Sequence, residues 1–160
     1  EQLPGFAETC VAAAPDWRLD QATRRSWPQL CAAHAPALTR VDGTARLVHA
    51  DLNPKNILVT RAAGGWRVDA LLDWEFAYAG SPWADAGNMA RFGADYPEGF
   101  LAGFAGAFEA DPYAARVLDM FALSDLVTRA PGHEIADLAA GVIRAWVRDG
   151  VPLDYDNRSD

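Results

Sequence analysis

The chain has 160 residues, of which 51% are hydrophobic and 22% are charged, and this composition excludes a disordered or fibrous protein. Its net charge of −8, from 14 basic and 22 acidic side chains, argues against a nucleic-acid or anionic-membrane partner and is compatible with a cationic small molecule. No apolar run approaches the roughly 20 residues of a membrane-spanning helix, and the two cysteines form no C-x-x-C pair, so we expect one cytoplasmic domain over residues 1–160.

The first part of the chain predicts helices. An Ala-rich segment from Leu3 to Ala14 is expected to form the first helix and to end near Pro15. Asp20 has the side chain of an N-cap and should begin a second helix from Gln21 to His34, which Pro28 is expected to kink or break.

The middle of the chain predicts a small β-hairpin. Pro36 is expected to close the helical region, and Asp42-Gly43 is typical of a turn. Three short β-like runs follow, at Arg46–His49, Ile57–Thr60 and Trp66–Leu72. Ala63-Gly64-Gly65 supplies the turn between the last two runs, and a loop over residues 50–56 leads into them. Apolar residues on both faces near one end predict that this end of the hairpin is buried.

Helices are expected again after Gly80-Ser81-Pro82. We expect them at Trp83–Phe92, Pro97–Ala110, Pro112 to about Arg129, and Ile135–Val147. The third begins with an N-cap and a proline at Asp111-Pro112 and should stop before Pro131-Gly132. The fourth has apolar residues at the helical period, and Gly150 should end it. The predicted fold class is therefore α+β and mostly α-helical.

The residues that indicate chemistry lie around the hairpin. The segment His49-Ala50-Asp51-Leu52-Asn53-Pro54-Lys55-Asn56 leads into it, and Asp73-Trp74-Glu75 follows it. Because the hairpin turns the chain back, Asp51, Asn56 and Asp73 can converge at one end. Phosphoryl transfer from ATP needs oxygen ligands for Mg²⁺ and a carboxylate that accepts the proton of a hydroxyl group. The D-x-x-x-x-N spacing from Asp51 to Asn56 is that of a kinase catalytic loop, and Asp73 stands where the D-F-G aspartate would, with Trp74-Glu75 in place of Phe-Gly.

These residues resemble a known family. The pattern His49-x-Asp51-x-x-Pro54-x-Asn56-Ile57-Leu58 with Asp73-Trp74-Glu75 is similar to the aminoglycoside phosphotransferase family, which resembles choline kinases and homoserine kinases. The segment Ala79-Gly80-Ser81-Pro82-x-x-Asp85-x-x-Asn88 is similar to the family's G-x-P-x-x-D segment. The resemblance implies a protein-kinase-like fold that uses ATP and Mg²⁺.

The resemblance also implies roles for single residues. Asp51 would be the catalytic base. His49, which belongs to the same catalytic motif, would brace the loop. Asn56 and Asp73 would bind Mg²⁺. Asp85 would hold the backbone of the catalytic loop, which is a structural role.

The sequence departs from the family pattern at three positions in the loop. Ala50 stands where the family usually has Gly, and Asn53 and Lys55 stand where His and Gly are frequent. We assign Asn53 and Lys55 to the cofactor site, where Lys55 either reaches a phosphate or points into solvent.

The resemblance covers only part of the family plan. Lys55 is the only lysine in the chain, and the residues before His49 predict helices without a Gly-rich loop between strands. We therefore expect the C-terminal large lobe alone, with the N-terminal lobe absent, a catalytic core at about residues 46–92 and a helical substrate-side region at about 97–150. The start at Glu1 rather than Met suggests a processed chain or a fragment, and such a lobe should bind ATP poorly by itself.

Two functional hypotheses remain from the sequence. In the first, the parent protein transfers the γ-phosphate of ATP to a hydroxyl of a small molecule. An aminoglycoside or related antibiotic is the first expectation for the acceptor, and choline-like, sugar or amino-alcohol acceptors stay open. In the second, the chain is a catalytically silent lobe that binds a ligand or assembles as a homo-oligomer around the surface that the absent lobe would cover.

Other ionisable and aromatic residues received structural interpretations. Four acids either line an acidic pocket for an aminated acceptor or form solvated helix faces, and the second interpretation is favoured: Asp119, Asp125, Glu134 and Asp137. Glu75 is interpreted as part of a surface salt bridge rather than the metal site. His34 and His133 are interpreted as structural, and the Trp and Phe residues of the C-terminal helices as core.

Overall fold

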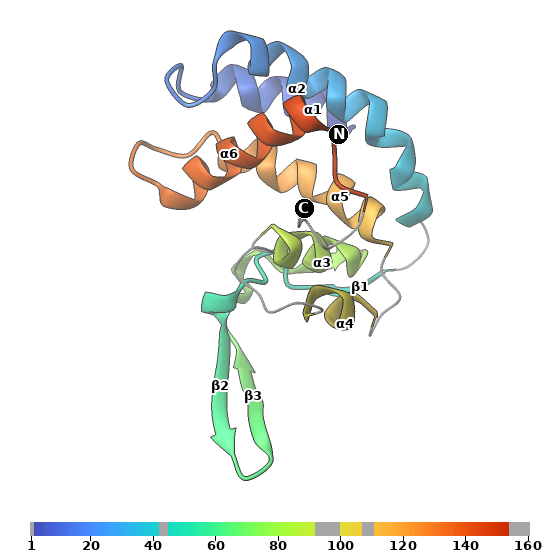
Figure 1. Cartoon of the computed structure of the whole chain (residues 1–160), viewed down its shortest axis with the longest axis vertical. Helices are drawn as coiled ribbons and strands as arrows, with labels where there is room; N and C mark the ends of the chain where they lie inside the picture. Colours follow the sequence, from blue (N-terminus) through green and yellow to red (C-terminus); the bar gives the residue numbers. More distant parts are fainter. Residues whose placement is uncertain (1, 42–44, 92–99, 107–110, 154–160) are drawn as a thin grey trace.

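The computed structural model describes residues 2–41, 45–91, 100–106 and 111–153 (Figure 1). The α-helices are α1 (Leu3–Ala13), α2 (Gln21–His34), α3 (Trp83–Ala90), α4 (Phe100–Gly106), α5 (Pro112–Leu126) and α6 (Glu134–Asp149). The strands are β1 (Arg46–Val48), β2 (Ile57–Ala62), β3 (Gly65–Leu71) and β4 (Tyr78–Gly80), and short 3-10 helices occupy η1 (Ala35–Val41), η2 (Pro54–Asn56) and η3 (Trp74–Phe76). This order confirms the mostly helical α+β expectation. None of the helices within these ranges is long and apolar enough to span a bilayer.

Local capping signals determine where several helices begin and end. Oδ1 of Asp20 accepts a 2.8 Å hydrogen bond from the Thr23 N–H and begins α2. Asp111 begins α5 in the same way, by accepting a 3.0 Å hydrogen bond from the Ala114 N–H. Gly150 ends α6 with φ of 94°, a conformation that glycine adopts without steric cost. The expected bounds of these helices are confirmed to within a few residues.

Two prolines of the N-terminal region, Pro28 and Pro36, do not end the helical segments in which they lie. The expected break at Pro28 is absent, because α2 continues through this residue. Trp27 and Cys31 beside it are fully buried, so tertiary packing outweighs the lost backbone hydrogen bond. Pro36 does not close the helical region either: η1 runs on to Val41, with Pro36 in its first turn, where no backbone N–H is needed.

The C-terminal end of α5 also differs from expectation. The helix stops at Leu126 rather than near Arg129. The guanidinium of Arg18 holds the turn that follows, donating 3.0 Å hydrogen bonds to the carbonyls of Val127 and Ala130. The predicted turn at residues 42–43 and parts of the predicted helices at 83–92 and 97–110 lie outside the described residues.

The main hydrophobic core lies between α1, α2, α5 and α6 (Figure 1). Trp27, Leu123 and Ile143 are fully buried in it, and the Trp27 and Trp146 rings lie 6.3 Å apart. The indole N–H of Trp27 donates a 2.9 Å hydrogen bond to the Ser124 hydroxyl, so the polar edge of this ring is satisfied. The expectation that Trp146 is a core residue is confirmed.

A second, smaller core lies beneath the loop that follows β1. Leu52 of this loop packs with Ala86 and Met89 of α3 and with Ala115 of α5. Gly87 lets α3 and α5 approach closely, because a Cβ at this position would lie 2.4 Å from the Ala115 carbonyl oxygen. The loop is therefore anchored on a tightly packed pair of helices.

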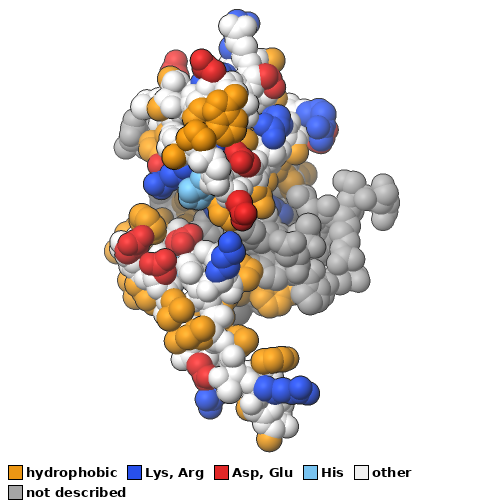
Figure 2. Space-filling view, turned by 90° about the vertical axis from the view of Figure 1, so that its left-hand side faces the viewer, with side chains coloured by type: hydrophobic (Ala, Val, Ile, Leu, Met, Phe, Trp, Pro, Cys, Tyr) orange, Lys and Arg blue, Asp and Glu red, His pale blue; other side chains and the backbone are white. Residues whose placement is uncertain are grey.

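The strands form two separate antiparallel pairs. β1 pairs with β4, with Leu47 opposite Ala79, and the sequence did not predict this pairing. β2 and β3 form the expected hairpin, which projects from the body of the molecule (Figures 1 and 2). Ile57 and Leu71 at its base pack against the second core, which confirms the expected burial of one end. The outer part of the hairpin is exposed.

Candidate active site

The loop that follows β1 turns sharply at Ala50, which has φ of 67°. The Asp85 carboxylate accepts 2.9 Å hydrogen bonds from the backbone N–H groups of His49 and Ala50, one on each oxygen. The side-chain amide of Asn88 donates a 2.8 Å hydrogen bond to the Ala50 carbonyl. Two side chains of α3 thus hold a backbone conformation that costs a residue with a Cβ about 1–2 kcal/mol.

His49 connects this loop to the segment that follows β3. Its ring is 2% exposed, and Nε2 lies 2.7 Å from the Leu72 carbonyl oxygen. Nδ1 accepts a 3.3 Å hydrogen bond from the Asp51 N–H. A carbonyl can only accept and an N–H can only donate, so these contacts together select the tautomer with the proton on Nε2. The Trp74 ring covers the imidazole, with the ring centroids 4.6 Å apart.

The backbone of Leu72 is held from both ends of the loop. Its N–H donates a 2.9 Å hydrogen bond to the Asn56 carbonyl, while its own carbonyl accepts from His49. The next residue, Asp73, has φ of 67°, and its exposed side chain makes no hydrogen bond or ion pair within the described part of the chain. The fold thereby brings Asp73 next to the loop that carries Asp51 and Asn56.

Two asparagine side chains fix the Asp51 carboxylate. The amide nitrogens of Asn53 and Asn56 lie 3.3 and 3.1 Å from its two oxygens, and each also donates a 2.9 Å hydrogen bond to the Asp51 carbonyl. The amide oxygen of Asn53 accepts from the Lys55 N–H at 3.0 Å and caps η2. The amide oxygen of Asn56 accepts no hydrogen bond from any residue that the structure describes, so it can serve as a ligand.

The donor set suits Mg²⁺. Mg²⁺ prefers hard oxygen ligands and is usually held by one or two carboxylates together with substrate phosphates and water. The amide oxygen of Asn56 and the carboxylate of Asp73 are such ligands. The described residues contain no cluster of three or more His, Cys, Asp or Glu side chains suited to a metal. They therefore form no metal site whose ligands are such side chains alone.

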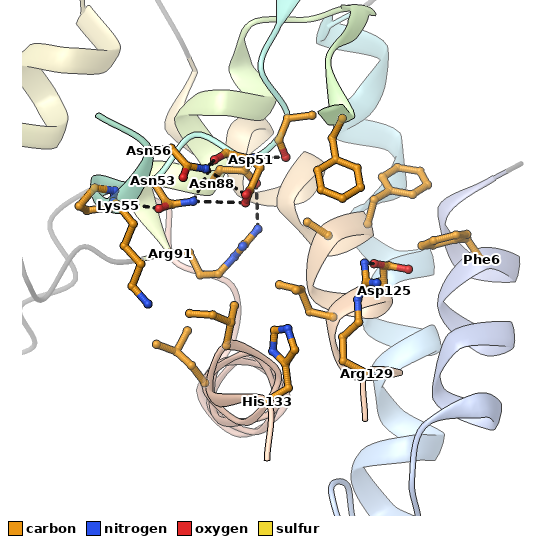
Figure 3. A pocket seen from close by; sticks show the side chains of 18 residues that line it. Phe6, Asp51, Asn53, Lys55, Asn56, Asn88, Arg91, Asp125, Arg129 and His133 are labelled. Atoms are coloured by element: carbon orange, nitrogen blue, oxygen red, sulfur yellow. Dashed lines mark hydrogen bonds and ion pairs between the residues drawn. The ribbon is translucent and has the colours of Figure 1, made fainter. Parts of the chain in front are cut away.

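A pocket of about 960 Å³ opens beside Asp51 (Figure 3). Polar residues of the loop lie along one side, and His133 and Arg129 lie on the opposite side. Of the predicted site residues, these line the pocket: Asp51, Asn53, Lys55 and Asn56. His49, Asp73 and Asp85 lie outside its lining.

The far wall of the pocket was missed by the sequence interpretation. Phe121, His133 and Leu138 belong to it, although His133 had been interpreted as purely structural. His133 also caps α6, because Nδ1 lies 3.4 Å from the Ala136 N–H. These residues carry no local motif, and only the helical period of α6 hinted at which of its side chains share a face.

The four acids with two open interpretations have different surroundings. Asp119 is buried and makes a bidentate ion pair with Arg91, whose side chain also contacts the Asn88 amide oxygen, so the solvated interpretation of Asp119 is wrong. Asp125 lines the pocket and pairs with Arg129 at 2.7 Å. Asp137 pairs with Arg18 outside the pocket. Glu134 is exposed and lies outside the lining.

Comparison with known proteins identifies a family. The family model described as the phosphotransferase enzyme family (APH) matches residues 1–118, well over half of the chain. No curated protein and no solved structure matches the chain. The matched range includes the loop of Asp51, the hairpin and α3, while the helical wall of the pocket from Phe121 onward follows it.

Proposed function

The chain belongs to the phosphotransferase enzyme family, and we propose that it is the catalytic lobe of an ATP-dependent O-phosphotransferase that acts on a small molecule. The observation that carries this proposal is the arrangement of three oxygen-bearing side chains. The carboxylate of Asp51 is held by Asn56, and the backbone hydrogen bonds of Leu72 bring Asp73 beside them.

The reaction transfers the γ-phosphoryl group of ATP to a hydroxyl of the acceptor. The acceptor oxygen forms a bond to the γ-phosphorus while the bond from that phosphorus to the β,γ-bridging oxygen breaks, and ADP leaves. Asp51 accepts the hydroxyl proton, because its carboxylate faces the pocket and the two asparagine amides fix its orientation.

The other residues orient the reacting groups. Asn56, through its amide oxygen, and Asp73, through its carboxylate, would hold Mg²⁺, which neutralises phosphate oxygens when bound. Lys55 is exposed and lines the pocket, and its ammonium group would contact a phosphate. His49 and Asp85 are positioning residues: Asp85 binds the backbone N–H groups of the two residues before Asp51, and the His49 ring contacts the Asp51 N–H and the carbonyl of Leu72, the residue before Asp73.

We further propose a division of the chain within a single domain. Residues from about 46 to 92 carry the phosphate and metal chemistry, and the helical residues from about 97 to 150 contribute the acceptor side. The second core packs Leu52 against α3 and α5 and so joins the two parts, which supports the single domain.

Release of ADP from Mg-ATP by the intact parent protein, in the presence of hydroxylated compounds, tests the proposal, because the lobe alone is expected to bind ATP poorly. Asp51→Asn removes the base but keeps the shape of the side chain, so turnover should fall by about 10²- to 10⁴-fold with unchanged melting temperature. Asp69→Asn makes the same change on the outer hairpin and should leave turnover unaltered. Equal turnover by Asp51→Asn and the wild type contradicts the assignment.

One observation favours a second candidate, a non-catalytic assembly module. Val59, Trp66 and Val68 share one face of the hairpin and are 51%, 72% and 58% exposed, and none of the described residues covers them (Figure 2). Such a module would release no ADP and would sediment as a dimer. Trp66→Ser should then restore a monomer, and a monomeric wild type rules this candidate out.

A further inference from the structure

The pocket beside Asp51 has the size and position of an acceptor site. Its volume of about 960 Å³ lies at the upper end of the range for sites that bind drug-sized molecules. Asp51 and Asn56 line one side, and the opposite side comes from α5, α6 and the turn between them. A molecule bound there can present a hydroxyl to the Asp51 carboxylate.

The wall opposite the loop is mainly apolar. It is built by these side chains: Phe6, Phe121, Leu126, Ile135 and Leu138, and Phe76 of η3 adds a further apolar side chain to the lining. The rings of Phe6 and Phe121 lie 5.5 Å apart and form one aromatic surface that joins α1 to α5. Two of the apolar side chains are substantially open to solvent, Phe76 at 52% and Leu138 at 37%, so a ligand that covers them gains hydrophobic free energy.

The charges of the pocket do not favour a polycation. The lining cations are Lys55, Arg91 and Arg129, and the lining carboxylates are Asp51 and Asp125. Asp125 is already paired with Arg129. The carboxylate of Asp51 is therefore the one lining acid, among the residues described, that makes no ion pair.

A buried ion pair makes one further carboxylate near the pocket unavailable to a cationic ligand. Arg91 lines the pocket, and its side chain and that of Asp119 are 5% and 1% exposed. Breaking such a pair leaves an uncompensated buried charge, so Asp119 cannot be released to bind an ammonium group of a ligand. A polycationic acceptor could pair one ammonium group with Asp51, but its other ammonium groups would lose hydration without gaining an unpaired carboxylate of the lining.

We propose that the acceptor is an uncharged, hydroxylated small molecule with a mainly apolar body. Its apolar body lies against Phe121 and Leu138, and one hydroxyl faces Asp51. That this molecule is the phosphoryl acceptor rests on the proposed phosphotransferase function. The binding preference itself follows from the walls and charges of the pocket.

Calorimetric titrations without nucleotide test the preference. The probes are glucose, phenyl β-D-glucoside and 2-naphthyl β-D-glucoside, which share hydroxyls and differ in apolar area, and kanamycin, which is polycationic. Affinity for the wild type should rise along the uncharged series, by roughly tenfold for each added ring that is buried, and kanamycin should bind more weakly than the naphthyl compound.

Two leucine variants locate the binding. Leu138→Asp introduces a carboxylate into the apolar wall, and Leu153→Asp makes the same change at a leucine that is 73% exposed and outside the pocket lining. Leu138→Asp should lower the affinity for the naphthyl compound by about tenfold and raise the affinity for kanamycin, whereas Leu153→Asp should change neither affinity. If Leu138→Asp melts at a lower temperature than the wild type, Ile135→Thr is tested in its place.

The proposal is overturned if kanamycin binds the wild type more tightly than the naphthyl compound, if the uncharged probes do not bind, or if the two aspartate variants behave alike. These titrations contain no ATP, so their failure leaves the phosphotransferase assignment intact. Conversely, apolar binding without any nucleotide turnover would preserve the binding preference and contradict the proposed reaction.

Discussion

His49 donates a 2.7 Å hydrogen bond from Nε2 to the carbonyl oxygen of Leu72, the residue that precedes Asp73. The same ring accepts a hydrogen bond from the Asp51 N–H through Nδ1. A single buried side chain therefore ties the backbone beside the proposed base to the backbone beside the proposed metal ligand. The distance between Asp51 and Asp73 is consequently set by a rigid imidazole rather than by two independent loops.

Replacing the His49 ring tests this connection between the two backbone segments. In His49→Phe the ring volume is nearly kept, but the Leu72 carbonyl and the Asp51 N–H lose their partners. We expect the free energy of unfolding to fall by about 1–3 kcal/mol, the usual cost of unsatisfied buried groups. Urea denaturation monitored by tryptophan fluorescence measures this. His49→Asn keeps an acceptor near the Nδ1 position and should lose less; equal stability of all three proteins would show that neither contact matters.

The close approach of α3 and α5 depends on Gly87. A Cβ there would lie 2.4 Å from the Ala115 carbonyl oxygen and 3.0 Å from Cβ of Asp119, so Gly87→Ala must displace a helix. We expect it to lower the free energy of unfolding by about 1–3 kcal/mol. Gly141→Ala is the matched control, because beyond its chain neighbours and the α6 backbone no atom lies within 4 Å of the new Cβ, and it should stabilise by roughly 0.5–1 kcal/mol. Chemical denaturation midpoints that move in the same direction for both variants would contradict the packing described.

The Cys31 thiol is predicted to be chemically inert in the folded protein. Burial raises its pKa to about 12, and the side chain is fully inaccessible. Because the thiolate is the nucleophile, alkylation with iodoacetamide at about pH 8 should modify Cys31 only after denaturant is added. Peptide mass spectrometry distinguishes it from Cys10. Rapid modification of Cys31 in native buffer would show that α2 opens readily.

The His34 imidazole should make stability depend on pH. Burial lowers its pKa, and Nδ1 lies 2.6 Å from the Tyr113 hydroxyl. The unfolded chain, with an ordinary histidine pKa near about 6.5, therefore binds the proton more readily than the folded chain. Its contribution to stability is complete above that pH and is lost as the pH falls through the folded-state pKa.

His34→Gln can still bond to Tyr113 but does not titrate. Urea denaturation between about pH 8 and pH 5 should show a smaller loss of stability in this variant than in the wild type, since His49 and His133 are common to both proteins. Parallel pH profiles would exclude His34 as a source of the acid sensitivity.

The sequence predicted those parts of the fold that depend on local signals. Asp20, Asp111 and Gly150 are caps whose effect is felt within one helical turn, so the ends that they set were predicted closely. The β1–β4 pairing was missed because both strands have only three residues, too few to show alternation, and their pairing is non-local.

In the candidate site, too, local patterns were predicted and non-local contacts were not. Asp51, Asn56 and Asp73 were predicted to converge because their order and spacing around a hairpin suit one chemistry. The ion pair of Arg91 with Asp119 was not, since it depends on how closely α3 packs on α5. The apolar wall of the pocket likewise combines side chains of α1 with those of α5 and α6, more than 100 residues away along the chain, and no spacing rule connects them.

The central claim is that Asn56 and Asp73 form a metal–phosphate site beside Asp51. Calorimetric titration of ADP with Mg²⁺, compared between the wild type, Asp73→Asn and the outer-hairpin control Asp69→Asn, tests it most directly. The account predicts Mg²⁺-dependent binding by the wild type and the control, and binding that is weaker by about 10- to 100-fold or lost in Asp73→Asn. Equal affinity of the three proteins, or binding that does not depend on Mg²⁺, would contradict it.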